Sequence, residues 1–186
     1  LQLVRYGKSV IRERMHFVER LNGILKDIHS SLTGGKEEIQ IIYEPNVSEE
    51  MFEEELARNR ERDLHFRQSC IGPHRDDFRV SVNGIDIRRF GSQGQQRTAA
   101  LSLKLAEIRL VEQEVKDTPV LMLDDVLSEL DSSRQNYLLQ SIHNIQTLIT
   151  CTGLDDFISN RFRINRVFQV SDGTVTLKQN QQEESK

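Results

Sequence analysis

The chain has 186 residues, of which 37% are hydrophobic and 29% are charged, and its 25 basic and 29 acidic side chains leave a net charge of −4 at pH 7. No apolar run approaches the roughly 20 residues needed to span a bilayer, which excludes a membrane protein, and Cys70 and Cys151 are too few for a disulfide framework. We therefore expect a cytoplasmic protein of one medium domain with or without an appendage, whose charge balance neither indicates nor excludes a nucleic-acid partner.

The first part of the chain predicts a mainly helical segment. Apolar side chains recur with a helical period over residues 1–33. Residues 38–43 read as a short strand. Ser48 stands before two acidic residues as a candidate N-cap for a second, highly charged helix that ends near residue 66. We interpret residues 1–70 as a helical arm subdomain with one short strand.

The second part, residues 71–178, has the pattern of an α/β segment. It opens with two short runs, 77–82 and 85–90, around Asn83-Gly84, which is the strongest short-range signal for a β-hairpin. The elements expected after it are a helix over 95–114, an apolar strand over 120–123, a helix over 132–143 capped by Asp131, a strand over 147–152, and a hairpin over 167–177. The polar residues 179–186 predict a disordered tail.

A strand that ends in two carboxylates is the first candidate site. Residues 120–123 are all apolar, which predicts burial on both faces, and Asp124 and Asp125 follow directly. Ligands of open α/β sheets bind at the carboxyl ends of strands. Because successive side chains point to opposite faces, one acid can hold Mg²⁺ while the other addresses a water molecule. The alternative interpretation is a strand that runs into an ordinary acidic turn.

A glycine-containing loop opens the helix that precedes this strand. Residues 91–94 offer unpaired backbone N–H groups, the positive end of a helix dipole and a serine hydroxyl, all of which suit a phosphate. Alone, such a loop favours an ordinary capped helix. Followed by a helix, an acid-tipped strand and the sequence Ser-Glu-Leu-Asp at 128–131, it favours a nucleotide site.

Residues 92–97 and 121–131 together resemble the RecF family of bacterial DNA replication and repair proteins, which belongs with the ABC-type ATPases near the heads of Rad50 and the SMC proteins. The residues Gly-Pro-His-Arg-Asp-Asp at 72–77 match the same family both in sequence and in their position along the chain. The resemblance is strong over 71–178 and looser over 1–70. It implies an α/β fold in which the second part is the C-terminal half of an ABC-type ATPase head and the first part is a lever-like arm.

The resemblance also implies roles for individual residues. Ser92, Gln93, Gly94 and Gln95 match the ABC signature, and Ser128 and Asp131 match the D-loop. Asp124 matches the Walker B carboxylate that binds Mg²⁺, and Asp125 matches the residue that activates the attacking water. Thr152 stands at the switch position. Gln93 stands where many relatives have Gly, and Asp125 stands where many have the longer Glu.

No P-loop motif, Gly-x-x-x-x-Gly-Lys-Ser/Thr, occurs in the sequence, and Gly7-Lys8-Ser9 lies within a helical pattern. In RecF-like proteins that loop lies in the N-terminal part, and a chain that begins at Leu1 is expected to be a piece of a longer protein. We therefore expect these residues to supply the signature and Walker B half-sites and to show no ATPase activity alone.

The function implied by the resemblance is that of an ATP-dependent DNA clamp in the response to DNA damage. Two copies would dimerise head-to-tail on ATP and Mg²⁺, hold single-stranded or gapped DNA, and help to load recombinase with RecO and RecR. The candidates for contact with DNA phosphates are Arg75, Arg79, Arg88 and Arg89. Two alternatives stay open: a non-catalytic module that docks a partner through the arm, and the head of another SMC-like or Rad50-like ATPase.

Overall fold

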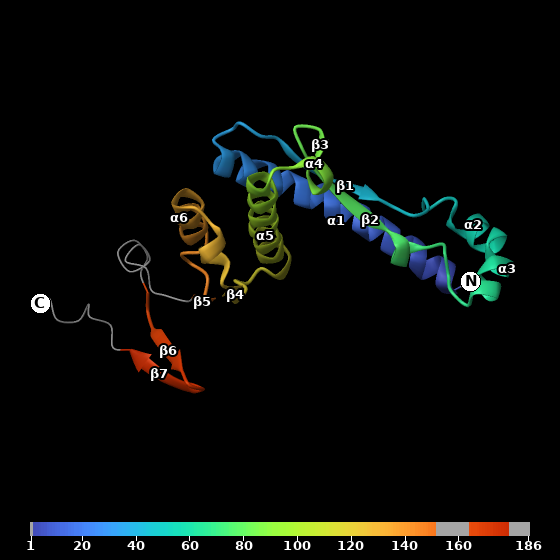
Figure 1. Ribbon diagram of the computed structural model, residues 1–186. Helices are drawn as coiled ribbons and strands as arrows, with labels where there is room; N and C mark the ends of the chain where they lie inside the picture. The colour runs from blue at the N-terminus through green and yellow to red at the C-terminus, as the bar shows by residue number, and fades with distance from the viewer. Residues whose placement is uncertain (1, 152–163, 179–186) are drawn as a thin grey trace, which may run out of the picture. The chain divides into compact units, whose positions relative to one another are not determined.

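A computed structural model describes residues 2–151 and 164–178 (Figure 1). The chain divides into two compact units, the first formed by Leu1–Leu121 with Leu130–Gln146 and the second by Met122–Glu129 with Thr147–Lys186. Within the described part of the chain, no helix has the length and apolar character to cross a bilayer. The division into an arm, 1–70, and a head portion, 71–178, stays a prediction, and the expected tail at 179–186 lies outside the described residues.

A single long helix, α1 (Gln2–Thr33), runs through the first unit, which confirms the helix predicted from the apolar period. Two glycines end it. Gly34 and Gly35 have φ angles of 63° and 74°, a left-handed conformation that costs glycine little. The Gly35 N–H donates to the Ser30 carbonyl at 2.8 Å, which satisfies one of the last carbonyls of the helix.

An antiparallel sheet of three strands lies against α1, in the order β1 (Ile39–Glu44), β2 (Asp77–Val82) and β3 (Ile85–Asp86). Asn22 of α1 fastens the sheet to the helix. Its side-chain amide donates to the Ile41 carbonyl and its side-chain oxygen accepts from the Ile41 N–H, both at 2.8 Å. One side chain of the helix therefore pairs both backbone polar groups of a strand residue, as a neighbouring strand would.

The predicted hairpin is confirmed at its turn and wrong along its second strand. Asn83 and Gly84 have φ angles of 51° and 77°, as a type I′ turn requires. The second strand was expected over 85–90, but it ends at Asp86 and the chain winds into the short helix α4 (Ile87–Phe90). The reason is a side-chain cap: the Asp86 carboxylate accepts the backbone N–H two residues later at 2.9 Å, which starts a helical turn.

The charged helix predicted from Ser48 to residue 66 forms two shorter helices, α2 (Phe52–Arg58) and α3 (Arg60–Phe66). The Ser48 hydroxyl accepts the Met51 N–H at 3.3 Å, so it lies in the preceding turn, and Met51 is the N-cap residue. Asn59 separates the two helices. Its side chain donates to the carbonyl four residues earlier at 2.9 Å and so competes with the continuing helix.

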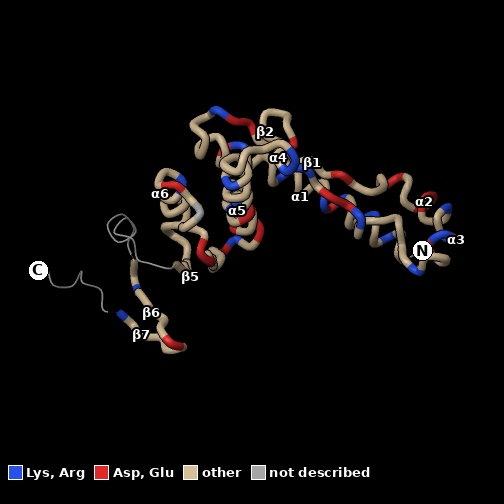
Figure 2. Tube along the Cα trace, in the orientation of Figure 1, with Lys and Arg blue, Asp and Glu red and all other residues tan. Residues whose placement is uncertain are grey.

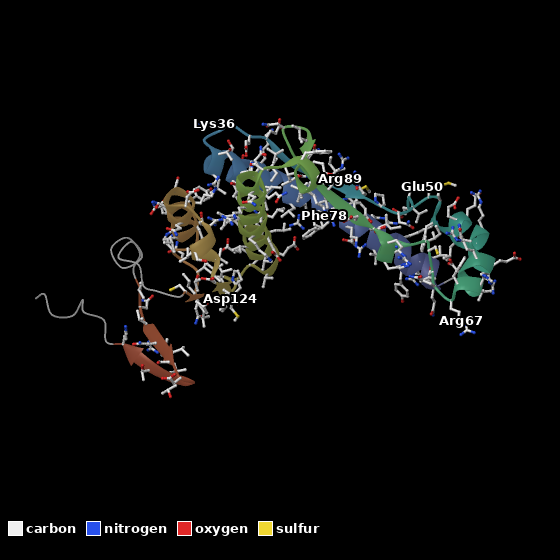
Figure 3. All side chains as sticks on the ribbon, in the orientation of Figure 1. Lys36, Glu50, Arg67, Phe78, Arg89 and Asp124 are labelled. Atoms are coloured by element: carbon white, nitrogen blue, oxygen red, sulfur yellow. The ribbon has the colours of Figure 1, made fainter. Side chains whose placement is uncertain are left out.

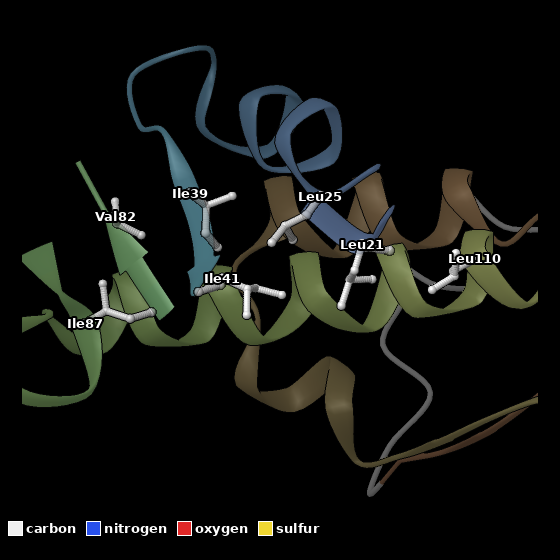
Figure 4. Packing of buried hydrophobic residues seen from close by; sticks show 9 residues of the cluster. Leu21, Leu25, Ile39, Ile41, Val82, Ile87 and Leu110 are labelled. Atoms are coloured by element: carbon white, nitrogen blue, oxygen red, sulfur yellow. The ribbon is translucent and has the colours of Figure 1, made fainter. Parts of the chain in front are cut away.

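The main core of the first unit joins α1, the sheet and the long helix α5 (Gln93–Val115). Its buried members are Leu21, Leu25, Ile39, Ile41, Val82, Ile87, Ala99, Ala106 and Leu110 (Figure 4). The α5 residues at the contact include two alanines, which leave room for the leucines of α1 to approach closely. Each fully buried large apolar side chain contributes about 1.5–3 kcal/mol, so this contact fixes α5 against the end of α1.

A second apolar cluster, formed by Ile11, Val47 and Phe52, explains a glycine inside α1. A Cβ atom at Gly7 would overlap the Phe52 ring, with Cζ only 2.8 Å away. The Gly7-Lys8-Ser9 sequence therefore belongs to a helix, as predicted, and its glycine is a packing site rather than part of a phosphate loop.

We predict that Gly7→Ala lowers the free energy of unfolding by about 1–3 kcal/mol, because the added methyl group overpacks the contact with Phe52. Gly23→Ala on the same helix is the matched control. Its Cβ would meet no atom within 4 Å, so it should stabilise the protein by about 0.5–1 kcal/mol. Thermal melting of both variants measures the difference, and equal effects would contradict the packing role.

The remaining elements complete both units. They are α6 (Ser132–Ser141), the two-stranded sheet of β4 (Leu121–Asp124) and β5 (Thr147–Thr150), the short 3-10 turn at Val126–Glu129, and the hairpin of β6 (Val167–Ser171) and β7 (Thr174–Lys178). The predicted burial of 120–123 on both faces is wrong: Val120 is 58% exposed and Met122 is 78% exposed. Within the described residues, β4 has β5 as its one strand neighbour, so part of its apolar surface stays uncovered.

Candidate functional site

The predicted signature loop forms a well-defined cap on α5. Ser92 is the N-cap residue: its hydroxyl accepts the Gln95 N–H at 3.2 Å, and the Gln95 side-chain oxygen accepts the Ser92 N–H at 3.1 Å. This reciprocal capping box places Gln93 and Gly94 in the first helical turn, two residues earlier than predicted. A Cβ at Gly94 would meet only the Ser92 oxygen, at 3.9 Å, so the backbone is open to a close approach. These features suit an anion.

The side chain of Gln95 is also bound by Glu37, which follows α1 in the chain. Its amide nitrogen donates to Glu37 Oε1 at 3.0 Å, and Glu37 Oε2 lies 3.3 Å from Nε2 of His29, a fully buried residue of α1. Burial lowers the pKa of His29, an effect that the neighbouring Glu37 carboxylate partly opposes. Glu37 and His29 were not among the predicted site residues, because nothing in their spacing indicates that they meet the signature loop.

The predicted D-loop residue Asp131 is connected to the signature helix through Arg134. Asp131 caps α6 by accepting the Arg134 N–H at 3.0 Å, and its carboxylate also pairs with the Arg134 guanidinium. Arg134 Nε donates to the hydroxyl of Thr98 on α5 at 2.8 Å, and that hydroxyl donates to the Gly94 carbonyl at 2.7 Å. The cap of α6 and the first turn of α5 therefore share one hydrogen-bonded path within the first unit.

The acid pair lies at the end of a parallel strand pair. The N–H groups of Leu121 and Asp125 donate to the carbonyls of Gln146 and Thr150, at 2.9 and 3.2 Å. Because the acceptor number rises with the donor number, β4 and β5 run in the same direction. Asp124 is the last residue of β4 (Figure 3), so the acid pair lies at the carboxyl end where α/β sheets bind ligands.

Thr150, which was not among the predicted site residues, connects the two acids. Its hydroxyl donates to the Asp124 carboxylate and accepts the Asp125 N–H at 3.1 Å. Asp125 itself has a φ of 51°, the left-handed conformation that Asp adopts more readily than most residues. The Ser128 hydroxyl donates to the Asp125 carbonyl at 2.8 Å and so closes the turn after the strand. The expected switch residue, Thr152, lies outside the described residues.

A magnesium ion fits the chemistry of the strand end. In the described ranges, no group of three or more His, Cys, Asp or Glu side chains gathers as a complete metal cage. Mg²⁺ does not need one, since it is usually bound by one or two carboxylates together with phosphate oxygens and water. Asp124 is exposed and offers such a carboxylate, which Thr150 orients through its hydroxyl.

Of the four arginines predicted to contact DNA, three pair with acidic side chains and one donates to a backbone carbonyl. Arg79 pairs with Glu44 at 2.8 Å, Arg88 with Asp77 at 3.5 Å and Arg89 with Asp86 at 3.8 Å, while Arg75 donates to the Ser69 carbonyl at 3.3 Å. Figure 2 shows basic and acidic residues interspersed in this part of the chain. The arrangement is that of a mixed surface, on which exposed ion pairs contribute little to stability and leave the guanidinium groups accessible.

The Gly-Pro-His-Arg-Asp-Asp sequence is anchored by its first aspartate. The Asp76 side chain is 2% exposed and accepts hydrogen bonds from Arg14 Nη1 at 2.8 Å, from the Asn46 N–H at 2.9 Å and from the Tyr43 hydroxyl. Burial, followed by the hydrogen bond to Asp76 and its negative charge, raises the pKa of Tyr43 to about 12, an effect that Arg14 partly opposes. This segment is therefore a structural junction between α1 and β1.

A capped loop opening a long helix, followed by an acid-tipped parallel strand, is the arrangement found in half of an ABC-type ATPase head. Over 175 residues the chain is 57% identical to the DNA replication and repair protein RecF of Agathobacter rectalis and 56% identical to that of Lachnospira eligens. The chain belongs to the RecF family. Each alignment covers 94% of this chain and 48% of the relative, so the chain spans about half the length of the curated relatives it matches.

Solved structures agree with this assignment. The recombination mediator protein RecF-ATP in the RecFOR pathway superposes with a TM-score of 0.81 and 34% identity, covering 96% of this chain and 48% of that one. The RecF-ATPrS structure of the same protein and pathway gives a TM-score of 0.79 over 94% of this chain. No family model matches the chain.

We predict that Thr98→Val lowers the free energy of unfolding by about 1–2 kcal/mol, because it leaves Arg134 Nε without its buried acceptor at almost unchanged volume. Thr118→Val, in the exposed segment after α5, is the matched control and should stay within about 0.5 kcal/mol. Chemical denaturation monitored by circular dichroism measures both. Equal stability of the two variants would contradict the connection between α5 and α6.

Proposed function

We propose that this chain supplies two half-sites of an ATP-dependent DNA clamp. The observation that carries the proposal is the capping box of Ser92 and Gln95, which fixes a serine hydroxyl and an open glycine backbone at the N-terminus of a 23-residue helix. The relatives support it: one solved structure is described as RecF-ATP, and the curated relatives are described as DNA replication and repair proteins.

In this proposal the two half-sites serve different nucleotides. Ser92, Gln93, Gly94 and Gln95 face the ATP held by a second copy, where the helix dipole and backbone N–H groups stabilise the terminal phosphate. Asp124 binds the Mg²⁺ of the ATP held by its own head. That ion would supply charge neutralisation at the phosphates when bound.

The roles proposed for the remaining site residues follow from their positions in the structure and in the sequence. Asp125, directed differently from Asp124 by its left-handed backbone, accepts a proton from the attacking water. Ser128 holds the backbone of Asp125, and Asp131 orients Arg134 against the signature helix. Thr152 would follow β5 as the switch position. ATP closes the dimer and hydrolysis opens it.

The DNA-binding part of the proposal assigns single-stranded or gapped DNA as the ligand. Arg75, Arg79, Arg88 and Arg89 would exchange their carboxylate or carbonyl partners for backbone phosphates, a contact that depends on charge rather than sequence. The solved relatives are described as recombination mediators in the RecFOR pathway, which supports RecO and RecR as partners in loading recombinase in the cytoplasm.

The first test of the proposal separates the roles of the two acids in a full-length RecF-family protein that carries this chain. Asp125→Asn should retain ATP binding and reduce turnover about a hundredfold or more, because it removes a general base. Asp124→Asn should weaken Mg²⁺-dependent ATP binding itself. Asp117→Asn, an exposed acid in the segment after α5, is the control. Wild-type turnover by the Asp125→Asn protein would contradict the assignment.

The second test concerns the signature loop. Ser92→Arg should leave ATP binding by the monomer intact and abolish ATP-driven dimerisation, because a long cation opposes the dipole and fills the space for the phosphate. Ser31→Arg, at an exposed position of α1, is the control. Analytical ultracentrifugation with and without ATP gives the monomer–dimer balance. An unchanged balance in Ser92→Arg would show that this loop is not an intermolecular phosphate site.

A further inference from the structure

A buried histidine at the end of α1 has a defined tautomer. His29 has no exposed surface, and its Nδ1 lies 2.9 Å from the Ser102 hydroxyl on α5. That hydroxyl donates its single proton to the Thr98 carbonyl at 2.8 Å. The hydroxyl can therefore only accept from the ring, so Nδ1 of His29 carries a proton.

The other ring nitrogen faces a carboxylate. Nε2 of His29 lies 3.3 Å from Glu37 Oε2, and it has no satisfied hydrogen bond within the described part of the chain. In a neutral ring protonated at Nδ1, Nε2 carries a lone pair, which repels a carboxylate. A favourable contact therefore requires one proton between His29 and Glu37, whichever of the two groups holds it.

The same carboxylate reaches the signature loop. While Oε2 of Glu37 faces the histidine, Oε1 accepts the side-chain N–H of Gln95 at 3.0 Å. The other end of the Gln95 amide accepts the Ser92 N–H. The Gln95 side chain is thus held at both ends, and the rotation of Glu37 about its own side-chain bonds is fixed by His29.

We infer that Glu37, oriented by the buried His29, is a positioning residue for the signature loop, and that it couples the end of the long helix α1 to the nucleotide of a second copy. The inference rests on the proposed function, in which Ser92 faces that nucleotide. Glu37 touches no substrate in this arrangement. It acts through Gln95, whose fixed amide keeps the Ser92 backbone and hydroxyl in one geometry.

The hydrogen bonds that Glu37 makes to Gln95 and His29 do not require its negative charge. In Glu37→Gln, the amide oxygen can accept from Gln95 and the amide N–H₂ can donate to the lone pair on Nε2 of neutral His29. Every contact of the native pair is then reproduced without a shared proton. Glu37→Ala removes both contacts. Comparison of the two variants therefore separates the positioning role from a role of the negative charge.

The test uses the full-length protein and follows ATP-driven dimerisation by analytical ultracentrifugation. Glu37→Ala should weaken the ATP-bound dimer about three- to tenfold, the value of one ordinary hydrogen bond. ATP binding by the monomer should not change. The Glu37→Gln protein should dimerise as tightly as the wild type. Glu38→Ala is the matched control, since the neighbouring Glu38 side chain is 73% exposed and pairs with Lys26.

Dimerisation of Glu37→Ala that equals that of Glu38→Ala, in a protein whose wild type does dimerise with ATP, would overturn this inference alone. Dimerisation of Glu37→Gln as weak as that of Glu37→Ala would also overturn this inference. If Glu37→Ala melts below the assay temperature, Glu37→Asp withdraws the carboxylate by one methylene group and makes the same comparison. A wild-type protein that does not dimerise with ATP would overturn the proposed function and, with it, this inference.

Discussion

The packing of α1 against α5 is the contact on which the first unit depends. Leu21 and Leu25 of α1 share one buried apolar cluster with Ala99 and Ala106 of α5, and the two helices are in direct contact. The same stretch of α1 also makes polar contacts with the sheet and with α5. Asn22, on the same helix, pairs with a strand of the sheet, and His29 reaches the hydroxyl of Ser102.

The two candidate half-sites are built by different means. In the signature loop, side chains cap a helix, so Ser92 is placed by two reciprocal hydrogen bonds with Gln95, whose side-chain amide also donates to Glu37. At the acid pair, the end of a parallel strand places the groups, and the Thr150 hydroxyl joins them. A helix cap can change its geometry when one hydrogen bond is lost, whereas a strand end is held by its neighbouring strand. One such hydrogen bond reaches the loop from outside it, from Gln95 to Glu37.

Local signals in the sequence were enough to predict most elements. The apolar period of α1 and the Asn83-Gly84 turn depend on residues close together in the chain, and both are confirmed. The break at Asn59 was missed because a side chain competed with the helix backbone, which an apolar period does not record. Glu37 and Thr150 were missed for another reason. Their partners are 58 and 25 or 26 residues away, so only the fold brings them together.

The central claim is that Ser92 and Asp125 of one chain act on different nucleotides. The most direct measurement mixes full-length Ser92→Arg and Asp125→Asn proteins before ATP is added and follows ATP turnover. In a mixed dimer, the intact Asp125 of one chain faces the intact Ser92 of the other, while both defects fall in the second site. The account predicts turnover in the mixture that neither variant shows alone. Absence of restored turnover, with mixed dimers demonstrated by differently tagged chains, would contradict it.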